Sequence, residues 1–123
     1  MPFEWNANGQ ARRVEAVASG SVTAADLQAF IDAMRAAGVM GYAKLVDLSY
    51  ASIEIHAAEV RALAASINRL AMDGETLGPV AFVVDSETAL DVIMLFEERT
   101  ARSSRALSIF GSRQHAREWL DRL

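Results

Sequence analysis

The stretch KLVDLSYASIEIHAAEVRAL, residues 44–63, decides the fold of this chain. It continues an apolar run, Tyr42–Leu48, that is typical of a β-strand. After a polar segment that predicts a loop, an amphipathic helix begins near His56 or Ala57 and continues to Met72. A strand that leads through a loop into a helix is the unit from which α/β folds are built. The stretch therefore predicts an α/β protein.

The residues upstream predict a hairpin followed by a helix. Pro2–Trp5 and Ala11–Ala18 are expected strands, and Asn6–Gly9 between them is a turn signal. Gly20–Asp26 predicts a loop that ends in a helix cap at Thr23. The helix that follows is expected to end at Gly38. Its apolar face consists of Leu27, Phe30, Ile31 and Met34.

Downstream, strands and helices alternate. Val80–Val84 is apolar on both faces, which predicts a central strand covered on both sides. Asp85 or Ser86 caps a third helix that continues to about Thr100. Arg105–Phe110 is the last expected strand, and Ser112 caps the last helix.

This order predicts one domain spanning residues 1–123, with a mostly parallel mixed sheet of about five strands. The first hairpin adds an antiparallel N-terminal edge strand, and four helices flank the sheet. The order and several patterned segments resemble the SpoIIAA-like fold of STAS domains (the STAS/SEC14 type). The segments that carry the resemblance are Gly20–Thr23, Leu45–Leu48, Val60–Leu63, Val80–Val84 and Ile109–Phe110 with Trp119–Leu120.

The resemblance also implies a phosphorylatable serine at the start of the second helix. In this chain the corresponding segment reads Ile55-His56-Ala57-Ala58, and Ala57 occupies the acceptor position. A phosphoserine switch is therefore not expected at that site. Ser49 and Ser52 lie in the same loop, either as substitute acceptors or as residues that only form local turn hydrogen bonds.

Composition and charge exclude several kinds of functional site and partner. The chain has no cysteine, which excludes disulfides, thiolate metal sites and cysteine nucleophiles. The N-terminal residues do not resemble a signal peptide, and no apolar run is long enough to span a bilayer, so a cytoplasmic protein is expected. A net charge of −4 argues against a nucleic-acid partner.

The basic residues are unevenly placed. Residues 99–123 contain six arginines and two acids, although the chain as a whole is acidic. This tail predicts either a patch for an anion or acidic partner, or simply a solvated last helix.

No catalytic constellation is visible. His56 with Glu59 and His115 with Glu118 have the spacing of ligand pairs on a helix, but a helix cap and an exposed helix explain them better. Asp47 at a strand end lacks the acidic partners of a phospho-receiver site. The sequence therefore predicts no enzyme, no cofactor and no metal.

Two candidate sites follow from the expected fold. Ligands of open parallel sheets bind at the carboxyl ends of the strands, and there we expect a ligand or partner corner. The corner consists of Ser49, Ser52, His56, Ser86 and Arg113. The third helix is apolar almost all round, so Leu90, Met94 and Leu95 either line an interface or groove or are covered by neighbouring helices.

Two functions fit these expectations. The first is a non-catalytic STAS-like regulatory or signalling module that forms a homodimer through the third helix and contacts a partner protein. The alternative is a binding protein for a small lipophilic ligand, as the SEC14-type resemblance implies, with Met34, Met94 and Phe96 in its pocket.

Overall fold

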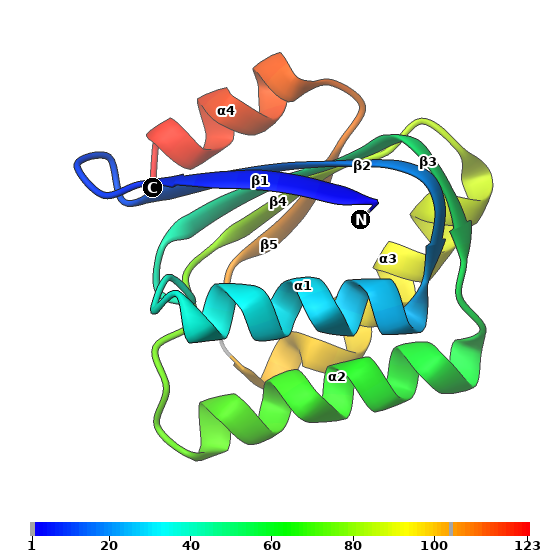
Figure 1. Cartoon of the computed structure of the whole chain (residues 1–123), viewed down its shortest axis with the longest axis horizontal. Coiled ribbons are helices and arrows are strands. Elements are labelled where there is room, and N and C mark those ends of the chain that lie inside the picture. Colours follow the sequence, from blue (N-terminus) through cyan, green and yellow to red (C-terminus); the bar gives the residue numbers. More distant parts are fainter. Residues whose placement is uncertain (1, 104) are drawn as a thin grey trace.

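A computed structural model of the chain describes residues 2–103 and 105–123, and it contains a five-stranded mixed sheet with helices on both faces (Figure 1). The strands are β1 (Phe3–Asn8), β2 (Arg13–Thr23), β3 (Ala43–Glu54), β4 (Val80–Val83) and β5 (Leu107–Phe110). The helices are α1 (Ala24–Ala36), α2 (Ala57–Met72), α3 (Glu87–Thr100), the short 3₁₀ helix η1 (Ala101–Ser103) and α4 (Arg113–Asp121).

The strands lie in sequence order across the sheet, from β1 to β5. β1 pairs antiparallel with β2, and every later neighbour pairs in parallel. All four residues of β4 are buried, because helices cover both of its faces. The predicted mixed sheet with an antiparallel N-terminal edge strand is confirmed.

The two faces of the sheet differ in how many helices cover them and in the size of the apolar core. Helices α1, α2 and α3 cover one face, and α4 covers the other (Figure 1). The three-helix face contains the large apolar core, whereas the α4 face contains a small one built on five buried side chains. Successive residues of a strand point to opposite faces. In β3, Val46 therefore belongs to the large core, and Leu45 belongs to the small one.

The helix caps are those that the sequence predicts. Thr23 and Asp26 form a capping box at the start of α1. Ser86 and Ser112 cap α3 and α4 by accepting backbone N–H groups through their hydroxyls. Gly38 has a φ of 73° just after α1, a conformation that glycine adopts without strain.

The hairpin between β1 and β2 turns later than expected. β1 continues to Asn8, and the turn occupies residues 9–12. The Asn8 side chain accepts hydrogen bonds from the backbone N–H groups of Gln10 and Ala11, which fixes the turn.

Strands β2 and β3 are longer than expected, because segments predicted to be loops are paired. Residues 19–23 pair in parallel with residues 50–54, beyond the point where β1 and β4 end. We call this part the β2–β3 ribbon; Figure 1 shows it curving past the ends of α1 and α2. Val22 and Ile53 are buried in the large core, and apolar burial on one face explains why the ribbon forms.

Candidate functional site

Three polar features of the structure could carry function. The first lies at the carboxyl end of β3, where Asp47 is only 1% exposed. Its Oδ1 accepts hydrogen bonds from the backbone N–H of Ser49 (2.9 Å) and from the Ser49 hydroxyl (2.6 Å). Its Oδ2 is paired with Nε of Arg113, the first residue of α4. The Arg113 guanidinium also lies over the Tyr50 ring, 5.8 Å from its centroid.

The Asp47 carboxylate is fully satisfied. Burial raises its pKa, but the hydrogen bonds from Ser49 and the charge of Arg113 outweigh burial, so the pKa of Asp47 lies below its ordinary value. A β-bulge next to Asp47 allows this contact, since β3 gains one residue between its pairings with Val17 and Ser19. The cluster ties α4 to the sheet.

The predicted corner is only partly assembled by these contacts. Ser49 and Arg113 meet on Asp47. Ser86 binds the N–H of Ala89 at the start of α3, and the N–H of His56 donates to the Glu59 carboxylate at the start of α2. Ser52 is exposed on the ribbon, five residues beyond Asp47, which is roughly 15 Å along a strand. That all five residues form one binding corner stays a prediction.

The expected apolar face of α3 is largely covered. Leu90 and Leu95 are partly buried against the large core, whereas Met94 is 52% exposed. Single exposed apolar side chains are normal on protein surfaces. A dimer interface through Leu90, Met94 and Leu95 stays a prediction.

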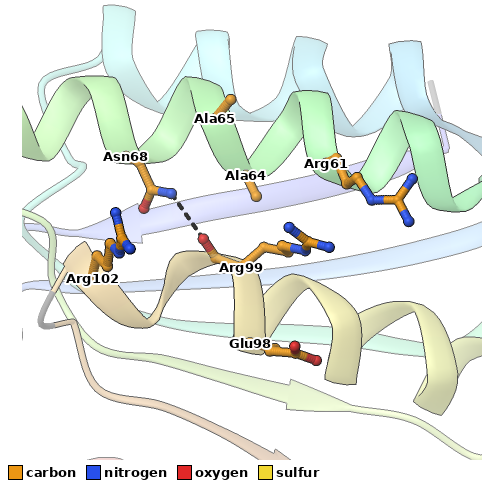
Figure 2. A pocket seen from close by; sticks show the side chains of 7 residues that line it. All are labelled: Arg61, Ala64, Ala65, Asn68, Glu98, Arg99 and Arg102. Carbon is orange, nitrogen blue, oxygen red and sulfur yellow. Dashed lines mark hydrogen bonds between the residues drawn. The ribbon is translucent and has the colours of Figure 1, made fainter.

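The second feature is a groove between α2 and α3, which we call the arginine groove. It has a volume of about 520 Å³ and contains three arginines and one acid. Its lining residues are Arg61, Ala64, Ala65, Asn68, Glu98, Arg99 and Arg102. Figure 2 shows the side chains of Arg61 and Arg99 extending in the same direction between the helices, with Arg102 at the other end beside Asn68.

Polar groups of the arginine groove lack partners within the part of the chain that the structure describes. Arg61, Arg99 and Arg102 are exposed and take part in none of the ion pairs. The Asn68 amide nitrogen donates to the backbone carbonyl of Arg99 (2.8 Å), as Figure 2 shows. The Asn68 amide oxygen is buried without a hydrogen-bond partner among the described residues. The groove therefore offers positive charge.

The third feature is a cavity inside the three-helix face, which we call the Lys44–Arg105 cavity. It has a volume of about 30 Å³. Ten of its twelve lining residues are apolar, and they come from α1, α2, α3, β3, β4 and the segment before β3. Lys44 is 2% exposed, and its Nζ donates to the backbone carbonyls of Met40 (2.6 Å) and Tyr42 (2.9 Å).

The loop that holds Lys44 is fixed by Gly78. The N–H of Gly78 donates to the same Met40 carbonyl (2.9 Å). A Cβ at position 78 would lie 2.2 Å from the Tyr42 carbonyl oxygen, so only glycine permits this approach. The two carbonyls that receive Lys44 are therefore held in place by backbone packing.

Both cations of the cavity are perturbed by burial. Burial, with a smaller contribution from the nearby Arg105 charge, lowers the pKa of Lys44 from 10.5 to about 7. Burial lowers the pKa of Arg105 to about 10, so the guanidinium remains charged at neutral pH. The guanidinium carbon of Arg105 lies 5.7 Å from the Phe96 ring centroid. The Nε and Nη2 atoms of Arg105 are buried without hydrogen-bond partners among the described residues.

Sequence reasoning did not select Lys44, Arg105 or Asn68 as site residues. One signal was present: Lys44 is the only lysine of the chain, and it stands inside an apolar strand. The burial of Arg105 depends on how the segment before β5 packs against α3, which no local pattern indicates.

Within residues 2–103 and 105–123, no group of three or more His, Cys, Asp or Glu side chains is arranged to hold a metal ion. The helices in that part of the chain are also too short or too polar to cross a membrane.

Comparisons with known proteins support the fold. No protein-family model matches the chain, and no curated protein matches it. Among solved structures, it is similar to the crystal structure of an uncharacterized DUF3478-family protein with a SpoIIAA-like fold from Shewanella loihica PV-4. The sequences are 13% identical, the match covers 96% of this chain and 91% of that one, and the TM-score is 0.59. The chain has a SpoIIAA-like fold, as its resemblance to STAS domains predicted.

Proposed function

We propose that this protein is a non-catalytic STAS-like interaction module that binds an acidic segment of a partner protein in the arginine groove. The observation that carries this proposal is the groove itself, where three exposed arginines have no carboxylate partner among the described residues. Outside the groove, Arg13, Arg35, Arg113 and Arg117 each contact an acid. Four other arginines take part in none of the ion pairs among the described residues, but none of them lines the groove: Arg12, Arg69, Arg105 and Arg122.

The charge of the groove stands out against the rest of the molecule. The chain carries a net charge of −4, so its overall charge does not attract a polyanion. Arginine binds carboxylates through two parallel N–H···O bonds, which favours glutamate and aspartate side chains over unspecific contact.

The strand-end corner is a weaker candidate for partner binding. Arg113, its only arginine, is already paired with Asp47 inside the protein. A partner carboxylate would have to displace a buried one, which costs more than binding an arginine that is exposed to water. The arginine groove needs no such exchange.

A fluorescent peptide of consecutive glutamates tests this function. We expect the wild-type protein to bind it with an affinity that falls as salt is added, because the contacts are exposed ion pairs. The double variant Arg99→Glu, Arg102→Glu should bind at least about tenfold more weakly, which is about 1.4 kcal/mol. The measurement is fluorescence anisotropy at low and at physiological salt.

The matched control is Arg69→Glu. Arg69 is exposed on the same helix, α2, but does not line the groove. If Arg69→Glu weakens binding as much per charge as the groove variants, the attraction is general and the proposed site is wrong. Absence of binding to wild type at low salt would also refute it.

The alternative function, binding of a small lipophilic ligand, is favoured by a separate observation. Met34 and Phe96, two of the three residues expected in such a pocket, line the Lys44–Arg105 cavity. Met94 does not line it.

A further inference from the structure

The two outer strands of the sheet, β1 and β5, present different side chains to solvent. In β1 the exposed side chains belong to one Glu, two Asn and one Ala. All four residues of β5 are partly exposed, and three of them are large and apolar: Leu107, Ile109 and Phe110. Proteins protect outer strands with charged side chains, prolines or bulges, or by keeping them short. Apart from its short length, β5 has none of these protections, so its outer edge can accept another strand.

The backbone of β5 has free hydrogen-bonding groups on that outer edge. The Val84 N–H donates to the Phe110 carbonyl, so residue 110 faces β4. Alternate residues of a parallel strand turn their backbone groups to opposite sides. Ser108 therefore also faces β4, whereas the N–H and C=O groups of Leu107 and Ile109 face outward. Among the described residues no strand lies on that side, because the sheet ends at β5.

A second copy of the chain is complementary to this edge. In an antiparallel pair with a twofold axis at Ser108, Leu107 lies opposite Ile109 of the second copy, and each such pair exchanges two N–H···O bonds. On the α4 face, Ser108 lies opposite Ser108 of the second copy, and Phe110 lies opposite Ala106. The pairing opposes no charge to another, which matters because two chains that each carry a net charge of −4 repel one another.

The same contact covers partly exposed apolar surface on both faces of the sheet. On the three-helix face, Leu107 and Ile109 pack at the margin of the large core. On the other face, Phe110 packs against Trp119 of α4, with 5.7 Å between the ring centroids, and both side chains are partly exposed. Removing this surface from water favours the pair in addition to its backbone hydrogen bonds.

We propose that two copies of the chain pair through β5, antiparallel about a twofold axis at Ser108, so that their sheets join into one. The contact is separate from the arginine groove, because no residue that lines the groove belongs to β5 or α4. It also differs from the expected contact through Leu90, Met94 and Leu95 of α3. The proposal can therefore fail while the proposed function stands, and the reverse.

Charge swaps at Ser108 test the twofold axis. Ser108→Glu and Ser108→Lys each place two like charges directly opposite one another. We therefore expect each variant alone to dimerise at least about threefold more weakly than wild type. An equimolar mixture of the two variants should form a heterodimer, because Glu then lies opposite Lys. Sedimentation velocity measures the dimer affinity, and native mass spectrometry separates the heterodimer from the two homodimers by mass.

Two other variants are matched controls. Ser52→Glu adds a charge at an exposed serine of the β2–β3 ribbon, and Met94→Glu adds one on the exposed side of α3. Both should dimerise like wild type. Four outcomes would overturn the proposal: a wild-type chain that stays monomeric at high concentration, undiminished dimers of both Ser108 variants, no heterodimer in their mixture, or a dimer that only Met94→Glu disrupts.

Amide hydrogen exchange of the wild-type protein gives a second test, which decides alone if the Ser108 variants do not fold. The N–H groups of Leu107 and Ile109 should exchange slowly in the dimer and faster after dilution, because the partner strand is then lost. The N–H groups of Trp5 and Ala7 point to the outer edge of β1 and should exchange equally at both concentrations. Exchange at Leu107 and Ile109 that does not depend on concentration would refute the β5 contact.

Discussion

The two ends of the core part of β3 contain buried charges in opposite situations. Asp47, at the carboxyl end, faces α4 and is paired with Arg113 and Ser49. Lys44, three residues earlier, faces the other helices beside a second cation and no acid. The alternation of a strand separates them onto different faces, so they cannot neutralise one another. A buried charge that has a counter-charge holds the structure together, whereas a buried charge without one lowers the stability of the fold.

The largest effect on stability is expected when Asp47 is replaced. We expect Asp47→Ala to lower the free energy of unfolding by about 3 kcal/mol, because it leaves the Ser49 N–H and the Arg113 guanidinium without their buried partner. Urea unfolding followed by circular dichroism measures this loss. Asp47→Asn, which keeps the shape and an acceptor oxygen for Ser49, should lose less. A loss below 1 kcal/mol for the alanine variant would mean that the cluster is not a structural tie.

A substitution of Lys44 should change the free energy of unfolding in the opposite direction. Lys44→Met should raise the free energy of unfolding by about 1–3 kcal/mol at pH 6, because it replaces a buried cation with an apolar side chain of similar length. The pKa of Lys44 is about 7 in the folded chain, against 10.5 ordinarily. The unfolded chain therefore holds more protons between these values, and wild-type stability rises with pH across that window.

The advantage of Lys44→Met should thus shrink as the pH rises from 7 toward 10. The same urea experiment in carboxylate-free buffers at several pH values measures the trend. A pH-independent difference between the two proteins would show that Lys44 titrates normally, and the contrast with Asp47 would disappear.

The smallest effect is expected at an exposed pair that also joins α4 to the sheet. Nη2 of Arg117 lies 2.8 Å from Oε1 of Glu15, and the two side chains are 47% and 34% exposed. The pKa of Glu15 lies below its ordinary value, mainly because Arg117 donates a hydrogen bond to its carboxylate. Water screens such pairs, so Arg117→Met should cost only about 0.5 kcal/mol. A loss as large as that of Asp47→Ala would mean that burial does not decide the strength of these ties.

Most of the fold was predictable, because local patterns carry it. The apolar run of β4, the hydroxyl caps of α3 and α4, and Gly38 after α1 each determine an element within a few residues. The β2–β3 ribbon was not predicted. Gly20 and the serines at 49 and 52 indicate loops, and the buried positions of Val22 and Ile53 depend on distant helices.

The candidate sites were less predictable than the fold, because they depend on contacts across the chain. The uneven placement of arginines left open an anion patch or a solvated last helix, and Arg99 and Arg102 line the arginine groove. The third arginine of that groove, Arg61, comes from α2, so only the packing of α2 against α3 brings it there. Lys44 and Arg105 are 61 residues apart in the sequence and meet only in the folded cavity.

The β2–β3 ribbon has a consequence for how the molecule opens. Beyond Asp47, β3 pairs with β2 alone, and beyond Ser19, whose N–H donates to the Pro2 carbonyl, β2 pairs with β3 alone. A two-stranded ribbon is marginally stable by itself and leaves alternate backbone groups of both outer edges to water. Its amide protons should therefore exchange with solvent faster than those of β4, through local fraying that leaves the sheet intact. We therefore expect the folded protein to open first in the β2–β3 ribbon, where β2 and β3 extend beyond β1 and β4.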